Sequence, residues 1–295
     1  MTRRGTCALA ALMLMGTALA VHAQHSSTPS NQHSYLGFDR NNYPGDAALP
    51  ALRKSFRYTG YWLNNPPGER QNSWTGKRAL LKQRGFGFLV LFNGRTYAEL
   101  KNADAPALGT ADGKAAVAAA AREGFPAHVL IFLDQEEGGR LLPEQAAYLF
   151  AWVDAVRAGG ARAGVYCSGI DVPDGNATIS TAQNIVEREQ AIAKKLSKDK
   201  SAAHLALWIA NDQCPPSPGC TLANTTQLTA AFSPAVAASA VVWQYAQSPR
   251  RAQFSAACPA NHAPDGNCYA PGVAPSANTF VDLNTANSPD PSETP

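Results

Sequence analysis

The sequence has no dense run of basic residues, and its formal net charge is only +3 over 295 residues. A surface that binds nucleic acid is normally marked by a basic patch or stripe, so this class of partner is not indicated. The chain also has no G-x-G-x-x-G after its first predicted strand and no G-x-x-x-x-G-K-[ST] anywhere. These glycine-rich loops bind dinucleotides and phosphates, and their absence removes the usual reason to expect an open, doubly wound sheet.

Histidine is scarce and poorly spaced for binding a metal ion. The six His residues form no H-x-x-x-H and no H-x-H pair. A barrel enzyme of unrelated chemistry, such as a metal-dependent amidase or lyase, would be expected to carry such a cluster. We therefore expect no metal site and no organic cofactor.

Long apolar runs are limited to the first segment of the chain. Arg3 and Arg4 precede an apolar stretch that ends in small residues at Ala23, which is typical of a secretory signal peptide over residues 1–23. The alternative is a membrane anchor, but the uncharged run over 5–20 is short for a spanning helix of about 20 residues. We expect cleavage after Ala23 or Ala20, a secreted or periplasmic protein, and no membrane span in the mature form.

Cysteine is rare, and its placement agrees with export. Cys7 leaves with the signal peptide, and loops rich in proline or glycine lie between Cys214 and Cys220 and between Cys258 and Cys268. Two local disulfides, Cys214–Cys220 and Cys258–Cys268, are the simplest arrangement in an oxidising compartment. Cys167 then stays unpaired. Its apolar surroundings in GVYCS favour a small buried residue over a nucleophile.

The remaining composition is that of a globular protein, with 45% hydrophobic and 16% charged residues. Polar residues 24–34 predict a flexible leader, and TANSPDPSETP over 285–295 predicts a disordered tail. We expect one domain over 35–284, because single barrels of about 250 residues are common. A monomer is expected.

Strand-like and helix-like segments alternate along this domain. Several strand candidates are nearly continuous apolar runs, as in parallel strands that are covered on both faces. The strands are predicted at 35–39, 57–63, 86–92, 128–134, 161–167, 204–210, 240–246 and 279–283, and the helices at 74–84, 112–123, 143–158 and 181–196. Thr110 or Asp112 is expected to open the second helix. The order predicts an α/β fold, a TIM-type (β/α)8 barrel that is irregular and lacks helices in its C-terminal part.

Carboxylates stand where several of these strands end, the face on which TIM barrels place their active sites. Asp39, Asp134 with Glu136, and Asp282 lie at the ends of the first, fourth and eighth predicted strands. Aromatic residues occupy the other ends and could stack on sugar rings: Tyr61, Trp62, Tyr166, Trp208, Trp243 and Tyr245. Acidic residues framed by aromatic side chains are typical of a carbohydrate site.

Residues two apart on a strand point to the same side, so Asp134 and Glu136 can converge while Glu137 points elsewhere. Like charges that are crowded together raise one pKa, which suits one carboxyl to act as an acid beside an ionised neighbour. Each carboxylate also has an ordinary alternative. Asp39 could cap a loop, Asp282 could pair with an arginine, and Glu136 could be a solvated loop charge.

Six motifs in order resemble those of glycoside hydrolase family 25, the barrel lysozymes: GFD, FLDQEEG, GVYCSG, WIAND, VVWQYA and FVDLN. A related family of secreted glycoside-hydrolase-like barrels of unknown function is a closer resemblance, because it shares GFDRNNYP and GYWLNNPP. The resemblance covers roughly residues 35–284.

This resemblance implies a barrel that binds a polysaccharide, most directly peptidoglycan, and cleaves it with Glu136 as general acid and Asp134 as companion carboxylate. Asp39 and Asp282 match acidic residues that flank the family's site. Two departures stand out: Asn41 replaces a serine that is usual in the lysozymes, and residues 212–236 have no lysozyme counterpart. The alternative to a glycosidase is therefore a catalytically silent glycan-binding barrel.

Overall fold

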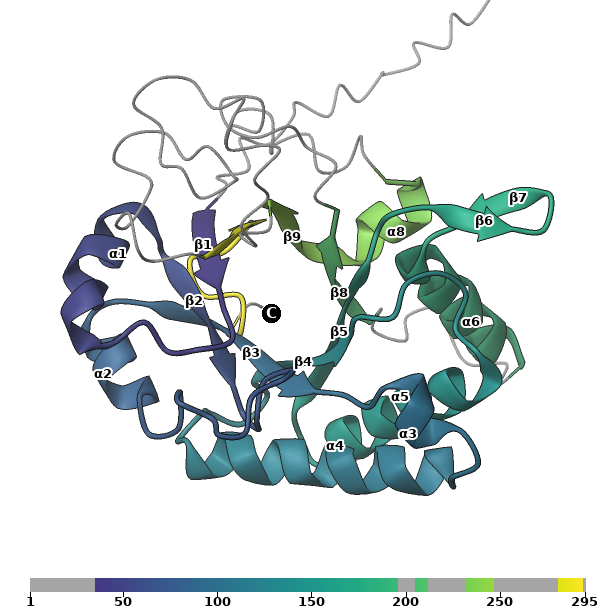
Figure 1. Ribbon diagram of the computed structural model, residues 1–295, viewed down its shortest axis with the longest axis horizontal. Helices are drawn as coiled ribbons and strands as arrows, with labels where there is room; N and C mark the ends of the chain where they lie inside the picture. Colours follow the sequence, from purple (N-terminus) through teal and green to yellow (C-terminus); the bar gives the residue numbers. More distant parts are fainter. Residues whose placement is uncertain (1–34, 196–204, 212–231, 247–280, 294–295) are drawn as a thin grey trace, which may run out of the picture. The chain divides into compact units, whose positions relative to one another are not determined.

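The computed structural model describes residues 35–195, 205–211, 232–246 and 281–293 (Figure 1). Eight of its strands close into a barrel in the order β1-β10-β9-β8-β5-β4-β3-β2, which confirms the predicted fold class. The barrel strands are β1 (Tyr35–Asp39), β2 (Tyr58–Trp62), β3 (Gly87–Asn93), β4 (Leu130–Gln135), β5 (Arg162–Ser168), β8 (Ala206–Ala210), β9 (Ala240–Ala246) and β10 (Asp282–Ala286). A hairpin of β6 (Val172–Asp174) and β7 (Ala177–Ile179) follows β5.

Helices lie between the strands over the first two thirds of the described chain (Figure 1). They are α1 (Leu49–Ser55), α2 (Arg78–Gln83), α3 (Tyr97–Leu100), α4 (Ala105–Arg122), α5 (Pro143–Ala158), α6 (Thr181–Lys195) and α8 (Pro234–Ser239), with a short 3-10 turn, η1 (Asp46–Ala48). Helix α5 has the predicted bounds, whereas α4 starts earlier than Thr110. The reason is Asp104, whose side chain accepts a hydrogen bond from Ala107 N at 3.0 Å and caps the helix there.

Helices α4 and α5 pack closely on each other because glycines in α4 face the backbone of α5. A Cβ at Gly109 would lie 2.2 Å from the Tyr148 carbonyl oxygen, and one at Gly113 would lie 2.7 Å from that of Trp152. No larger side chain fits at either position unless the helices separate. This pair covers β3, β4 and β5 from outside, below the barrel in Figure 1.

The last barrel strand differs from its prediction in both bounds and direction. It runs from Asp282 to Ala286, antiparallel to β9 and to β1, whereas the other neighbouring barrel strands are parallel. Parallel strands require a crossover connection, usually helical, and the Pro- and Gly-rich segment before β10 has no helical pattern. Residues 279 and 280 of the predicted strand lie outside the described residues.

The predicted disordered tail over 285–295 is wrong for residues 285–293. Thr285 and Ala286 belong to β10, and the following residues fold across the N-terminal ends of β3 and β4. Ser292 N donates to Phe88 O at 3.1 Å, and Leu130 N donates to Ser292 O at 2.9 Å. The segment has the polar composition of a disordered tail. Its backbone nevertheless forms hydrogen bonds with backbone groups of β3 and β4, so the ordered domain extends to residue 293.

Among the described residues, no helix is both long enough and apolar enough to span a membrane.

Candidate active site

Four acidic side chains lie at the face of the barrel where its parallel strands end and β10 begins. We call them the carboxylate cluster: Asp39, Asp134, Glu136 and Asp282. Asp39 ends β1 and is paired in register with Asp282 of β10. Asp134 of β4 is paired with Tyr166 of β5. All four carboxylates raise the pKa of Tyr166, after the larger effect of burial, so the Tyr166 hydroxyl lies among them.

Two side-chain amides hold Asp39 in place inside the barrel. Gln244 of β9 and Asn284 of β10 both donate to Asp39 Oδ1, at 3.0 and 2.6 Å. Each amide is in turn fixed by an aromatic donor, since Tyr166 OH donates to Gln244 Oε1 and Trp208 Nε1 donates to Asn284 Oδ1, both at 2.8 Å. Asp39 is therefore rigidly oriented.

The Asp39 carboxyl is held at an unusual pKa by opposing effects. Burial raises the pKa of Asp39, and the charge of Glu136 raises it further, whereas the hydrogen bonds from Asn284 and Gln244 lower it. The net result is a pKa of about 6. This carboxyl therefore changes charge near the middle of the physiological pH range.

Asp134 is the most isolated member of the carboxylate cluster. Its side chain is only 5% exposed, and neither carboxyl oxygen has a hydrogen-bond partner among the described residues. Burial raises its pKa well above the ordinary value, and the charges of Glu136 and Asp39 raise it further. Buried polar groups are normally paired, so two unpartnered oxygens indicate a position that is completed by something else.

Glu136 follows β4 by one residue and is exposed at the rim of the barrel. Protein covers one side of its carboxyl, and this partial burial raises its pKa. Because Glu136 also raises the pKa values of Asp39 and Asp134, the three carboxyls share protons rather than titrate one by one.

Asp282 is half-buried at the start of β10 and lies near Arg40, which follows β1. Burial lowers the pKa of the Arg40 guanidinium, and Asp282 opposes this effect. Arg40 Nε has no hydrogen-bond partner among the described residues. One cationic group thus stands at the edge of the carboxylate cluster.

Three of the predicted aromatic residues lie at this end of the barrel interior. Tyr166 and Trp208 are paired across β5 and β8, with ring centroids 4.7 Å apart. Trp62 ends β2 and its indole nitrogen donates to Arg40 O at 3.1 Å. Trp208 is completely buried, so of these rings Tyr166 is the one that is partly open to solvent.

Of the other three predicted aromatic residues, Tyr61 and Trp243 face away from the carboxylate cluster. Tyr61 is 0% exposed, donates to Glu123, and packs against Phe88 and Phe125 outside the barrel. Gln244 reaches inward to Asp39, so its neighbour Trp243 faces outward, where its indole nitrogen donates to Asn211 O at 3.1 Å. Tyr245 is buried against Trp243. Tyr61 and Trp243 pack the barrel wall, because strand alternation turns them away from the cluster. The register of β9 against β10 shifts at Tyr245, and Tyr245 adds to the raised pKa of the buried Tyr58.

The motifs GFDRNNYP and GYWLNNPP interlock beside the carboxylate cluster. Asn41 Nδ2 donates to Pro67 O at 3.0 Å, and Asn41 O accepts from Trp74 Nε1 at 2.9 Å. Asn42 Nδ2 donates to Glu69 Oε1 at 2.6 Å. Asn41, which stands where the lysozymes usually have serine, therefore ties the β1 loop to the β2 loop.

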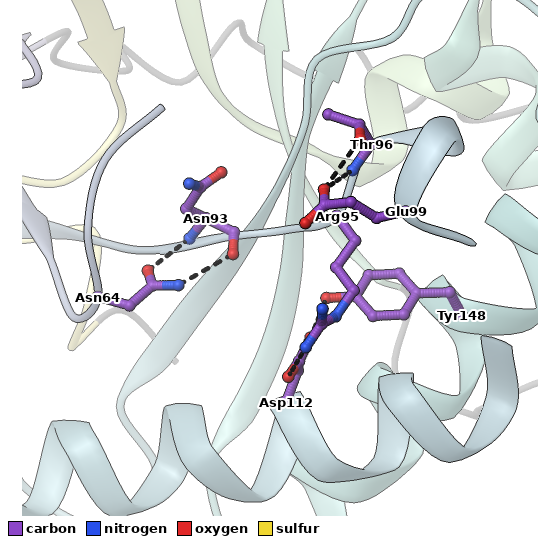
Figure 2. Close-up of polar contacts among 7 residues, drawn as sticks. All are labelled: Asn64, Asn93, Arg95, Thr96, Glu99, Asp112 and Tyr148. Atoms are coloured by element: carbon purple, nitrogen blue, oxygen red, sulfur yellow. Dashed lines mark hydrogen bonds and ion pairs between the residues drawn. The ribbon is translucent and has the colours of Figure 1, made fainter. Parts of the chain in front are cut away.

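Figure 2 shows the polar contacts that fix the loop after β3. Asn64 and Asn93 bond reciprocally, with Asn64 Nδ2 donating to Asn93 O at 3.0 Å and Asn93 N donating to Asn64 Oδ1 at 2.7 Å. Arg95 forms a bidentate ion pair with Asp112 of α4, at 2.6 and 3.0 Å. Tyr148 of α5 donates to the same carboxylate at 2.9 Å.

This loop touches the backbone that carries the cluster. A Cβ at Gly94 would lie 2.5 Å from the carbonyl oxygen of Asp134, so only glycine permits the approach. Glu137 completes the attachment, because its Oε2 accepts from Tyr97 N at 2.8 Å, at the start of α3, and also from Gln145 Nε2 of α5. Glu137 is thus engaged in structural hydrogen bonds while Glu136 faces the cluster.

Cys167 is buried in β5 and free, as the sequence predicts, and burial raises the pKa of its thiol. The predicted disulfide residues Cys214, Cys220, Cys258 and Cys268 lie outside the described residues, as do the predicted signal peptide and leader. Within the described ranges, no group of three or more His, Cys, Asp or Glu side chains is arranged to hold a metal ion.

Comparison with solved structures returns barrels of low sequence identity. An uncharacterized B. stearothermophilus protein has a TM-score of 0.52 and 18% identity, with 85% of this chain and 95% of that chain covered. The Tat-secreted protein Rv2525c of Mycobacterium tuberculosis, in complex with L-tartrate, has a TM-score of 0.45 and 14% identity over 86% and 94%. The spore cortex lytic enzyme SleM of Clostridium perfringens has a TM-score of 0.47 and 14% identity over 86% and 68%.

No match was found among curated proteins. The family model described as "Rv2525c-like, glycoside hydrolase-like domain" matches residues 55–216, more than half of the sequence. This segment carries Asp134, Glu136 and Tyr166 of the site described above. The chain belongs to the Rv2525c-like glycoside hydrolase-like domain family.

Proposed function

We propose that the protein is a glycosidase that acts on a cell-wall glycan, with peptidoglycan as the substrate implied by its lysozyme-like motifs. The observation that carries this proposal is Asp134, a buried carboxyl with both oxygens unpartnered among the described residues, directly beside the exposed carboxyl of Glu136. Hydrolysis of a glycosidic bond requires two carboxyl groups of this kind. Membership in a glycoside hydrolase-like family supports the same reaction class.

Glu136 is assigned as the general acid. Its position at the rim allows it to reach the oxygen of a bond lying across the barrel mouth, and its raised pKa allows it to keep a proton until that bond breaks. Transfer of this proton to the leaving oxygen spares the departing sugar a negative charge.

Asp134 is assigned as the carboxylate that stabilises positive charge on the sugar. Positive charge develops at the sugar carbon as the bond breaks, and an adjacent carboxylate stabilises it. That positive charge also offsets the burial that raises the pKa of Asp134, so substrate favours the ionised form. Asp39, Asp282 and Tyr166 would then orient the sugar.

The test is release of reducing ends from purified peptidoglycan and from chitin-type oligomers between pH 4 and 8. Glu136→Gln keeps the shape of the side chain but removes the transferable proton, so turnover should fall by about 10²–10⁴-fold while binding is kept. Asp134→Asn should cost a comparable amount. Asp154→Asn, at an exposed position on α5, is the matched control and should behave as wild type. If wild type and Glu136→Gln release equally few ends yet both bind the polymer, the protein is a glycan-binding barrel and the hydrolase assignment is wrong.

Export through the predicted signal peptide is part of this proposal, because cell-wall glycan lies outside the cytoplasm. The mature chain is expected to begin near Gln24. Mass spectrometry of protein recovered outside the cytoplasm measures this directly, and an intact Met1 terminus on that protein would contradict it.

A further inference from the structure

We propose a lateral sugar subsite beside the carboxylate cluster, in a cavity of about 280 Å³ lined by Gly169, Asp171, Ser180, Asn211, Phe232 and Ser233, among other residues. The proposal rests on the glycosidase assignment and extends it, since it states where the glycan continues after it leaves the central carboxylates. The cavity is smaller than the sites of about 300–1,000 Å³ that hold drug-sized ligands, so its size suits one sugar ring rather than a longer segment.

Two sets of contacts link the wall of the cavity to the residues of the carboxylate cluster. In the first set, Gly138 follows the Glu136–Glu137 pair, and a Cβ built on it would lie 3.8 Å from that of Ser168, the residue before Gly169. In the second, Asn211 N donates to Gln244 O at 3.0 Å, and the Gln244 side chain holds Asp39. The cavity therefore lies on the same face of the barrel as the carboxylates, beside the loops that follow β5 and β8.

The lining carries the groups that recognise a hydroxyl-rich ring. The Asp171 carboxylate is exposed and has no hydrogen bond or ion pair to a described residue, so it can accept from sugar hydroxyls. Ser233 lies at the start of α8, and its side chain makes no capping hydrogen bond, which leaves its hydroxyl available. Phe232 is half-buried and supplies an aromatic surface, on which the apolar face of a sugar can lie.

Gly169 shapes this aromatic wall. A Cβ at this position would lie 2.4 Å from Ile209 Cγ2 and 3.1 Å from Phe232 Cε1, so a larger residue would displace the ring. Phe232 is also braced from behind by Trp243, with ring centroids 6.3 Å apart and nearly perpendicular planes. The outward-facing Trp243 therefore supports the subsite rather than the central carboxylates.

The experiment measures binding of chitin-type oligomers of two to six sugar units by calorimetry, in a Glu136→Gln background that prevents turnover. Asp171→Ala and Phe232→Ala should each weaken binding of the six-unit oligomer by about tenfold, the loss expected for one charged hydrogen bond or one aromatic contact. Binding of the two-unit oligomer, held at the carboxylates, should not change. Asp154→Ala serves as control for the loss of an exposed carboxylate and should change neither.

Equal weakening for both lengths, or for neither, overturns the subsite. In the otherwise unmodified enzyme, Asp171→Ala should shift the product lengths released from the six-unit oligomer, and an unchanged product pattern also counts against it. If the Glu136→Gln protein binds no oligomer and the wild type releases no reducing ends, the glycosidase assignment itself fails, and the subsite fails with it. Retained cleavage with no effect of either variant removes the subsite alone.

Discussion

Asp39 and Asp282 face each other across an antiparallel pair, the last residue of β1 opposite the first residue of β10. In a parallel strand at this position, the acidic residue would have to be the last one of the strand in order to lie at the C-terminal face of the barrel. Because β10 runs the other way, it presents the carboxylate with its first residue instead. The antiparallel strand therefore keeps two acidic side chains together where β1 ends.

Replacing the buried charge of Asp134 should make the protein more stable. Burial raises the pKa of Asp134, so this carboxyl favours folding when protonated, and that contribution is lost as pH rises through its folded-state pKa. Asp134→Asn should raise the free energy of unfolding at pH 7, because it removes a carboxylate whose burial is unfavourable. Denaturant unfolding at pH 7 and pH 4 measures the difference.

The gain should shrink as pH falls to 4, because the wild-type carboxyl is then protonated in the folded state and about half protonated in the unfolded state. Asp154→Asn, on the surface of α5, should show no such pH dependence. A stability gain that is equal at both pH values would mean that the charge of Asp134 is not its cause.

Glu137 should tolerate loss of its charge but not loss of its oxygen. Tyr97 N and Gln145 Nε2 both donate to the same atom, Oε2, so a glutamine that places its oxygen there keeps both bonds. Glu137→Gln should therefore leave turnover close to wild type. Glu137→Ala should lower the free energy of unfolding by about 1–3 kcal/mol, because it leaves the side-chain amide of the buried Gln145 unpaired. If Glu137→Gln reduces turnover as strongly as Glu136→Gln, the acid has been assigned to the wrong residue.

The closing segment at the end of the described chain should be required for stability. Asp290 Oδ1 accepts from Phe88 N at 3.0 Å and from Ser292 Oγ at 2.7 Å. Asp290→Ala should cost about 1–3 kcal/mol, the usual penalty for an unsatisfied buried donor. Glu293→Ala, which removes only an exposed ion pair with Lys82, should cost less than about 1 kcal/mol. Thermal unfolding of the two variants compares them, and equal costs would contradict the role of Asp290.

Cysteine pairing outside the described residues remains a prediction. Cys214–Cys220 and Cys258–Cys268 should form two local disulfides, each worth about 2–3 kcal/mol in the chain-entropy description. A non-reduced peptide map of the exported protein identifies the pairs. A peptide that links Cys167 to another cysteine would refute this pairing and would also disagree with the buried, free thiol in β5.

The strands and the position of the carboxylates could be predicted because both follow from local sequence. Apolar runs such as those of β3 and β4 fix the strands, and polar residues directly after them, such as Asp134, fall at one end of the barrel. The direction of β10 could not be predicted, because strand direction depends on which partner the chain reaches and leaves no local pattern.

The amides that hold Asp39 were also missed, although a signal exists. Gln244 and Asn284 are polar residues within buried strands, and such groups need partners. The aromatic errors have the same origin. Neighbouring residues of a strand face opposite sides, so Tyr61 and Trp62 could not both line one site, and the same alternation separates Trp243 from Gln244.

The bond from Asn284 to Asp39 joins residues 245 positions apart. This bond can therefore form only after β10 has been synthesised, and β10 follows the other barrel strands in the chain. Contacts of such long sequence separation form slowly, because loop closure precedes them. A chain that ends before β10 would keep Gln244 but lack Asn284, so Asp39 would lose one of its two amide donors. The hydrogen-bonded setting of Asp39 is therefore complete only after β10 has closed the barrel between β1 and β9.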